Sequence, residues 1–182
     1  VQMFGRAYGG GDTRELALRM KAGQQLVFGE QIGWLDPSLV KEADTTGFFK
    51  KAVQLRHYLR RYFYAGEMAR PPRFTAEVPK VKADWQWSGE WWVTTDAVLT
   101  GAWRIPAEGK TVLIFANVSA EPVNASLKLN GSELGIPATG QQAVILRDPK
   151  SPGEPITLPA TGEYPMTFQP SEVLAIEFGV AQ

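Results

Sequence analysis

The sequence contains no cysteine among its 182 residues, only one histidine, and no excess of either charge. The absence of cysteine excludes disulfides, thiolate zinc sites and a cysteine nucleophile. Nineteen basic residues balance nineteen acidic ones, so the chain as a whole lacks the electrostatic footprint of a nucleic-acid or membrane-surface binder. No run approaches the roughly 18 to 20 apolar residues that a membrane span needs. We therefore expect no nucleic-acid partner and no membrane association.

Recognisable catalytic motifs are also missing. The single histidine, His57, falls on the charged face of a predicted helix, with no carboxylate at helical spacing to orient it, so we expect a solvated surface position. The chain shows no nucleophile–base pair, phosphate-binding glycine loop or cluster of metal ligands. We expect no cofactor and no bound metal.

What the chain does contain is a change of pattern at Arg70-Pro71-Pro72-Arg73. Before it, apolar residues recur at helical spacing and predict helices near residues 13–30 and 46–66. Leu16, Met20 and Val27 share one face of the first helix, with Gly23 among them, which would let a neighbouring backbone segment come close. Because two helices are too few to enclose a core, we expect this stripe to stay partly exposed or to be covered by a second copy of the chain.

After residue 73 the apolar period becomes two, which is typical of strands. Both faces of residues 111–118 are apolar, so this segment is predicted to be a central strand covered on both sides. Residues 125–130 alternate and end at Asn130-Gly131, a hairpin signal. Leu174, Ile176 and Phe178 are predicted to share a strand face. Short strands punctuated by Gly and Pro indicate an antiparallel sandwich, with further strands predicted at residues 97–104, 142–147, 164–168 and 173–178.

Five of the six tryptophans lie between residues 85 and 103. Indole rings stack on the apolar faces of sugars and of bases, so Trp85, Trp87 and Trp91 are candidate ligand-binding residues for carbohydrate. Packing is the commoner role for large aromatic side chains at a domain junction. Solvent exposure of these rings distinguishes the two interpretations.

Six segments of the chain carry a resemblance to a known family, namely residues 1–6, 27–37, 56–63, 99–104, 112–118 and 170–178. They resemble a bacterial family of glycoside-hydrolase-like (β/α)8-barrel proteins, the DUF6259 type. The resemblance implies an α+β fold class in which two or three helices end a (β/α)8 barrel and an antiparallel β-sandwich follows. It also implies a domain boundary between residues 1–73 and 74–182. The partner would then be an upstream barrel domain of the same polypeptide.

The resemblance further implies that the parent protein is a glycoside hydrolase whose catalytic carboxylates lie upstream, so that this chain alone is inactive. Glu30 is the one weak catalytic candidate, although a capping or ion-pairing role is more common for a glutamate at a helix end. A carbohydrate-binding module and a purely structural sandwich are the alternatives. Formation of a homo-oligomer through exposed helix faces is a further possibility. A periplasmic or extracellular location would follow if the parent carries a signal peptide.

Overall fold

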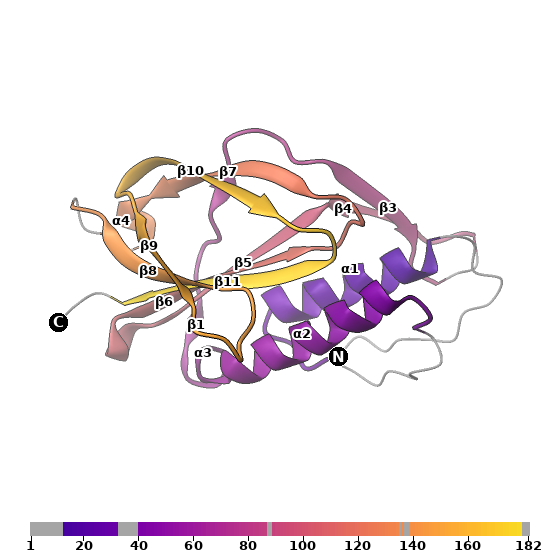
Figure 1. The fold of residues 1–182 in the computed structure, drawn as a ribbon, viewed down its shortest axis with the longest axis horizontal. Coiled ribbons are helices and arrows are strands. Elements are labelled where there is room, and N and C mark those ends of the chain that lie inside the picture. Colours follow the sequence, from indigo (N-terminus) through magenta and orange to yellow (C-terminus); the bar gives the residue numbers. More distant parts are fainter. Residues whose placement is uncertain (1–12, 33–39, 87–88, 135, 137–138, 180–182) are drawn as a thin grey trace.

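The computed structural model describes residues 13–32, 40–86, 89–134, 136 and 139–179 (Figure 1). Its α-helices are α1 (Arg14–Val27), α2 (Ala43–Tyr58), α3 (Arg60–Ala65) and the single turn α4 (Gly131–Leu134), and a short 3-10 helix, η2, spans Pro106–Glu108. Its strands are β1 (Glu67–Met68), β2 (Arg73–Phe74), β3 (Lys80–Asp84), β4 (Trp92–Asp96), β5 (Val98–Ile105), β6 (Lys110–Asn117), β7 (Val123–Asn130), β8 (Gln141–Leu146), β9 (Glu154–Leu158), β10 (Thr161–Phe168) and β11 (Glu172–Gly179). Among these residues, none of the helices has the length and apolar character needed to cross a membrane.

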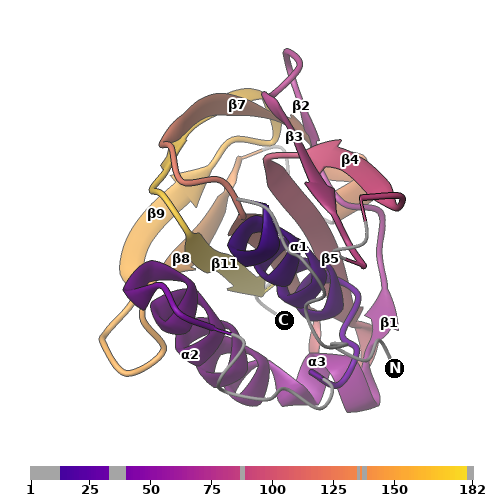
Figure 2. The ribbon, with the colours of Figure 1, turned by 90° about the vertical axis from the view of Figure 1, so that its right-hand side faces the viewer.

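The strands form three antiparallel sheets. One has six strands in the order β1-β5-β6-β11-β8-β9, one has three in the order β10-β7-β2, and β3 pairs with β4 as a hairpin. Figure 2 shows α1 and α2 on one side of the six-stranded sheet and β7 on the other. The molecule is therefore a sandwich of two sheets with a helical layer on the outer face of the larger one.

Strand β6 lies in the middle of this arrangement and is buried on both faces. Val112, Ile114 and Ala116 belong to the cluster shared with the helices, whereas Leu113 and Phe115 belong to the cluster between the two sheets. Strand β11 divides in the same way, with Leu174, Ile176 and Phe178 all facing the second sheet. The sequence predictions for both strands are confirmed, because two covered faces require apolar residues at odd and even positions alike.

Glycines stand on both sides of the contact between helix α1 and the sheet. A Cβ atom at Gly23 of α1 would lie 2.9 Å from Cγ1 of Val118. A Cβ at Gly101 of β5 would lie 2.5 Å from the backbone oxygen of Val27. Neither position has room for a larger side chain without movement of its neighbour, so these glycines set the distance between helix and sheet.

Two buried cations tie α1 to its neighbours. Arg19 is only 5% exposed, and its Nε donates to the Val118 carbonyl at 2.8 Å while Nη1 donates to the Thr45 hydroxyl of α2 at 2.6 Å. Lys21 Nζ donates to the Trp85 carbonyl at 2.6 Å, beyond the end of β3. Burial lowers the pKa of Lys21, with the charge of Asp84 opposing that shift. Hydrogen bonds thus join helix α1 to Val118 at the end of β6, to α2 and to the β3–β4 hairpin.

The predicted fold class is wrong. The structure consists mostly of antiparallel sheets, and its few helices do not form the helical set of a barrel end. Helices α1 and α2 instead share one core cluster with β6 and β11. Helical periodicity shows that a face must be buried, but it does not show what buries it. A domain boundary between residues 73 and 74 stays a prediction.

Two local expectations also fail. Met20 and Val27 are buried against the sheet, and Leu16 packs beside them, so the α1 stripe is not left open. Asn130-Gly131 does not form a two-residue hairpin, because β7 is followed by α4 and the chain crosses to β8 in the other sheet. In both cases a tertiary contact outweighs a local signal.

We expect Gly101→Ala to lower the free energy of unfolding by about 1–3 kcal/mol, because the added methyl group meets the backbone of α1. The matched control is Gly47→Ala in α2, where a Cβ would have no heavy atom within 4 Å. That control should raise stability by about 0.5–1 kcal/mol, since alanine is the better helix former. Urea denaturation measures both values. Equal effects of the two substitutions would show that the close approach of α1 is not a constraint.

Tyr62 generates a prediction about alkaline pH. Its hydroxyl donates to Glu177 Oε1 at 2.8 Å, and burial, together with the charge of Glu177, raises the pKa of Tyr62. The unfolded chain therefore loses this proton first, at a pH of about 10. The stability that depends on the proton is complete below that pH and is lost as pH rises further. In Tyr62→Phe, the slope of unfolding free energy against pH between about 10 and 11 should be shallower than in the parent chain. Identical slopes in the two proteins would contradict the assignment.

Candidate functional site

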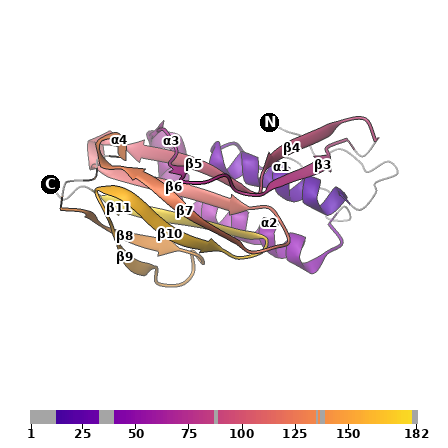
Figure 3. The ribbon, with the colours of Figure 1, turned by 90° about the horizontal axis from the view of Figure 1, so that it is seen from above.

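The β3–β4 hairpin carries the tryptophan-rich segment and lies beside the start of α1 (Figure 3). Its register pairs Lys80 with Asp96, Lys82 with Thr94, and Asp84 with Trp92. Because alternate residues of a strand share a face, these six side chains lie on one face of the hairpin. Val81, Ala83 and Val93 occupy the opposite face and pack into the helix-side core.

The structure separates the three predicted tryptophans. Trp85 is partly buried against the helix-side core, with Lys21 Nζ 5.8 Å from its ring centroid. Trp87 lies outside the described residues. Trp91 is 57% exposed at the end of the hairpin, where its carbonyl accepts from the Trp85 backbone N–H at 2.9 Å. Their ligand-binding role stays a prediction.

Trp103 and Trp92 take opposite roles. Trp103 packs edge-on against Phe63 and donates its indole N–H to the Val27 carbonyl at 3.1 Å. Trp92 is 47% exposed on the outer face of the hairpin. Its Nε1 donates to the Gly89 carbonyl at 2.9 Å, and Lys82 Nζ lies 5.4 Å from its ring centroid. These contacts hold the Trp92 ring at the surface in a defined orientation.

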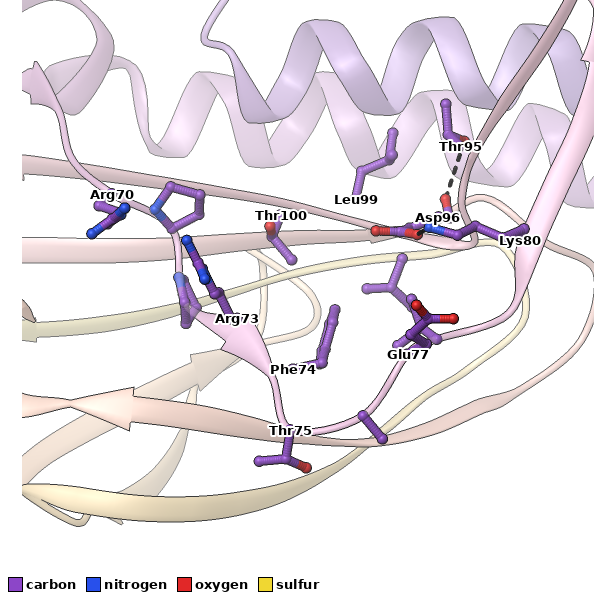
Figure 4. Close-up of a pocket in the computed structure, with 15 residues that line it drawn as sticks. Arg70, Arg73, Phe74, Thr75, Glu77, Lys80, Thr95, Asp96, Leu99 and Thr100 are labelled. Carbon is purple, nitrogen blue, oxygen red and sulfur yellow. Dashed lines mark hydrogen bonds and ion pairs between the residues drawn. The ribbon is translucent and has the colours of Figure 1, made fainter.

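The outer face of the hairpin leads to an open groove of about 780 Å³ at the edge of the sandwich. The groove lies between the chain segment from residue 70 to residue 80 and the strands β4 and β5 (Figure 4). In Figure 4 the Phe74 ring points into it, with Arg70 and Arg73 at one end and Lys80, Asp96 and Glu77 at the other.

Charges of both signs line this edge groove. Lys80 forms an ion pair with Asp96, which raises the pKa of the lysine through their hydrogen bond and charge attraction. Arg70 lies 3.6 Å from a carboxylate oxygen of Glu133. The two carboxylates among the described lining residues are Asp96, which is half exposed and ion-paired with Lys80, and Glu77, which is exposed. The edge groove thus presents both hydrogen-bond donors and acceptors to solvent.

A second groove, of about 850 Å³, runs along the outer side of the helical layer. It is lined by apolar and aromatic side chains that include Val53, 51% exposed, and Tyr64, 69% exposed. Its charged lining residues are Lys50, Arg56 and Arg60, together with the exposed His57. No carboxylate is among the described residues that line this helical groove. The predicted surface position of His57 is confirmed.

Glu30 follows the end of α1 and lines neither groove. Its backbone carbonyl accepts from Arg56 Nε at 2.7 Å, and its backbone N–H donates to the Gln25 carbonyl at 2.8 Å. Its Oε2 is buried and has no hydrogen-bond partner among the described residues. These contacts fix the chain at the end of the helix, and a catalytic role for Glu30 stays a prediction. The described part of the chain also contains no group of three or more acidic or histidine side chains placed to hold a metal ion.

No protein-family model matches the chain, and no curated protein matches it. Similar solved structures include a GH27 β-L-arabinopyranosidase from Geobacillus stearothermophilus, at 10% identity, 92% coverage of this chain, 31% of that chain and a TM-score of 0.47. A GH30 endoxylanase from Clostridium papyrosolvens is 11% identical, with 98% of this chain and 41% of that chain covered and a TM-score of 0.44. An α-amylase from Geobacillus thermoleovorans is 12% identical, with 92% of this chain and 34% of that chain covered and a TM-score of 0.46. The structural neighbours are thus glycoside hydrolases of low identity, and the chain spans 31–41% of their lengths.

Sequence analysis did not identify Trp92, Lys82 or Asp96 as site residues. The sequence did contain a signal for their placement on one face. Lys80 and Lys82 alternate with the apolar Val81 and Ala83 before Gly89, and Trp92, Thr94 and Asp96 occupy every second position after it. Alternation on both sides of a glycine predicts a hairpin with the charged positions and Trp92 on one face. The edge groove has no such local signal, since its walls come from segments that are adjacent only after folding.

Proposed function

We propose that this chain is the C-terminal, non-catalytic part of a bacterial glycoside hydrolase, in which the sandwich supports an upstream catalytic domain. The resemblance to DUF6259-type proteins supplies the class of parent protein. The observation that carries the supporting role is the helical groove, which stays open although the inner faces of α1 and α2 are already buried. Exposed apolar surface rimmed by polar residues is typical of an interaction site.

The charges of the helical groove favour a different domain over a second copy as its occupant. A symmetric dimer places the same surface patch on both subunits. The patch of Lys50, Arg56 and Arg60 would then meet the same patch of the second copy, with no carboxylate among the described lining residues to neutralise it. Like charges brought together in an interface oppose association. An upstream domain that presents apolar side chains and carboxylates satisfies the same surface.

The first test is activity. The isolated chain should release no sugar from a panel of neutral oligosaccharides, because the proposal places the catalytic carboxylates in the upstream domain and no carboxylate is among the described residues that line the helical groove. The full-length protein should cleave at least one member of the panel, and Glu30→Gln should change its rate by less than about threefold, as expected for a residue outside the reacting groups. Turnover by the isolated chain that disappears in Glu30→Gln would refute both the non-catalytic assignment and the structural role of Glu30.

The second test addresses the supporting role. Val53→Lys should leave the isolated chain within about 0.5 kcal/mol of its original stability, since Val53 is half exposed there. In the full-length protein, the same change buries a charge at the domain contact and should lower the melting temperature by several degrees. Val144→Lys on β8, also at an exposed valine, is the matched control and should act equally in both proteins. Equal effects of Val53→Lys in the two proteins would refute docking at this groove.

A further inference from the structure

The outer face of the β3–β4 hairpin presents an aromatic ring and polar groups in one row. Trp92, Thr94 and Asp96 occupy alternate positions of β4. On β3, Lys82 lies opposite Thr94 and Lys80 lies opposite Asp96. From Trp92 to Asp96 the row is about 13 Å long at ~3.3 Å per residue. That length spans more than one unit of a sugar chain.

The Trp92 ring is preorganised for stacking. The hydrogen bond from its Nε1 to the Gly89 carbonyl and the contact with Lys82 restrict the rotation of the indole, while 47% of the residue stays exposed. A ring that is already held in place loses little conformational entropy when a ligand binds. The flat indole face is complementary to the apolar C–H face of a pyranose ring.

The far end of the row supplies the polar part of a sugar site. Lys80 and Asp96 form a fixed donor–acceptor pair that also lines the edge groove. Thr75, Thr95 and Thr100 add hydroxyl groups to the groove walls, and the Phe74 ring points into the space between them (Figure 4). Sugar hydroxyls both donate and accept, so a surface that mixes the two functions suits them better than a surface of one charge.

We propose that Trp92, the row beside it and the edge groove bind a neutral polysaccharide chain. Trp92 stacks on one sugar ring, and the Lys80–Asp96 pair hydrogen-bonds the hydroxyl groups of a neighbouring unit. The choice of carbohydrate rests on the proposed function of the parent protein. A single-stranded nucleic acid is the competing occupant, because Arg70, Arg73 and Lys80 line the groove together with Glu77 and Asp96. We favour a neutral chain because the two carboxylates offset the attraction of these cations for phosphates, whereas an uncharged sugar meets no such opposition.

The test measures binding by the isolated chain, so it does not depend on catalysis. Affinity electrophoresis in gels containing β-glucan, arabinoxylan or soluble starch should show retardation in at least one gel. Calorimetry with the hexasaccharide of that polymer then gives the affinity. Trp92→Ala should weaken it about tenfold, the equivalent of one stacked ring. Asp96→Asn should weaken the affinity about threefold or more, because the site loses one charged hydrogen-bond acceptor.

Phe28→Ala is the matched control, because Phe28 is also a 47% exposed aromatic residue but lies at the end of α1. It should leave the affinity within about twofold. Thermal melting of each variant establishes that it is folded, and Asp96→Asn decides the outcome if Trp92→Ala does not fold.

Three results would overturn the proposal. The first is no retardation in any of the three gels. The second is a loss of binding in Trp91→Ala while Trp92→Ala keeps its binding, which would place the ligand on the other side of the hairpin. The third is oligothymidylate binding that displaces the hexasaccharide. Binding by the isolated chain combined with an inactive full-length protein would refute only the hydrolase function. Hydrolysis by the full-length protein without binding here would refute only this site.

Discussion

The close contact between α1 and the six-stranded sheet is the constraint on which the rest of the structure depends. Gly23 and Gly101 remove the side chains that would otherwise hold the helix away from β5 and β6. The buried guanidinium of Arg19 then reaches the Val118 carbonyl at the end of β6 and Thr45 of α2. A buried cation of this kind is stable only with its partners in place, so the contact fixes the position of α1 as well as its distance.

This contact explains why the two cores are organised around β6 and β11. With α1 and α2 on one face and the second sheet on the other, both strands lose contact with water on both sides. The helices bury their inner faces in the same step. Their outer side keeps an apolar groove with a cationic rim, to which we propose that the upstream domain docks.

Helix α1 also determines which tryptophan side chains are exposed to solvent. Lys21 binds the Trp85 carbonyl, and Thr13 accepts from the backbone N–H of Asp84 at 3.3 Å, so β3 is held over the start of the helix. One face of the hairpin then packs into the core with Trp85 beside it. The other face, with Trp92, Lys82 and Asp96, turns to solvent next to the edge groove.

The sequence alone determined the helices near residues 13–30 and 46–66, the doubly buried strand at 111–118 and the shared face of Leu174, Ile176 and Phe178. Periodicity is a local property that survives without knowledge of the partner. Tertiary structure decided that the sheet covers Met20 and Val27. The sequence had predicted partial exposure of these side chains, and the family resemblance had implied that the helices end a barrel. Tertiary structure also decided that Trp92 faces outward, and that residues 70–80 and 95–100 enclose a groove, because sequence periodicity does not specify which distant segments meet.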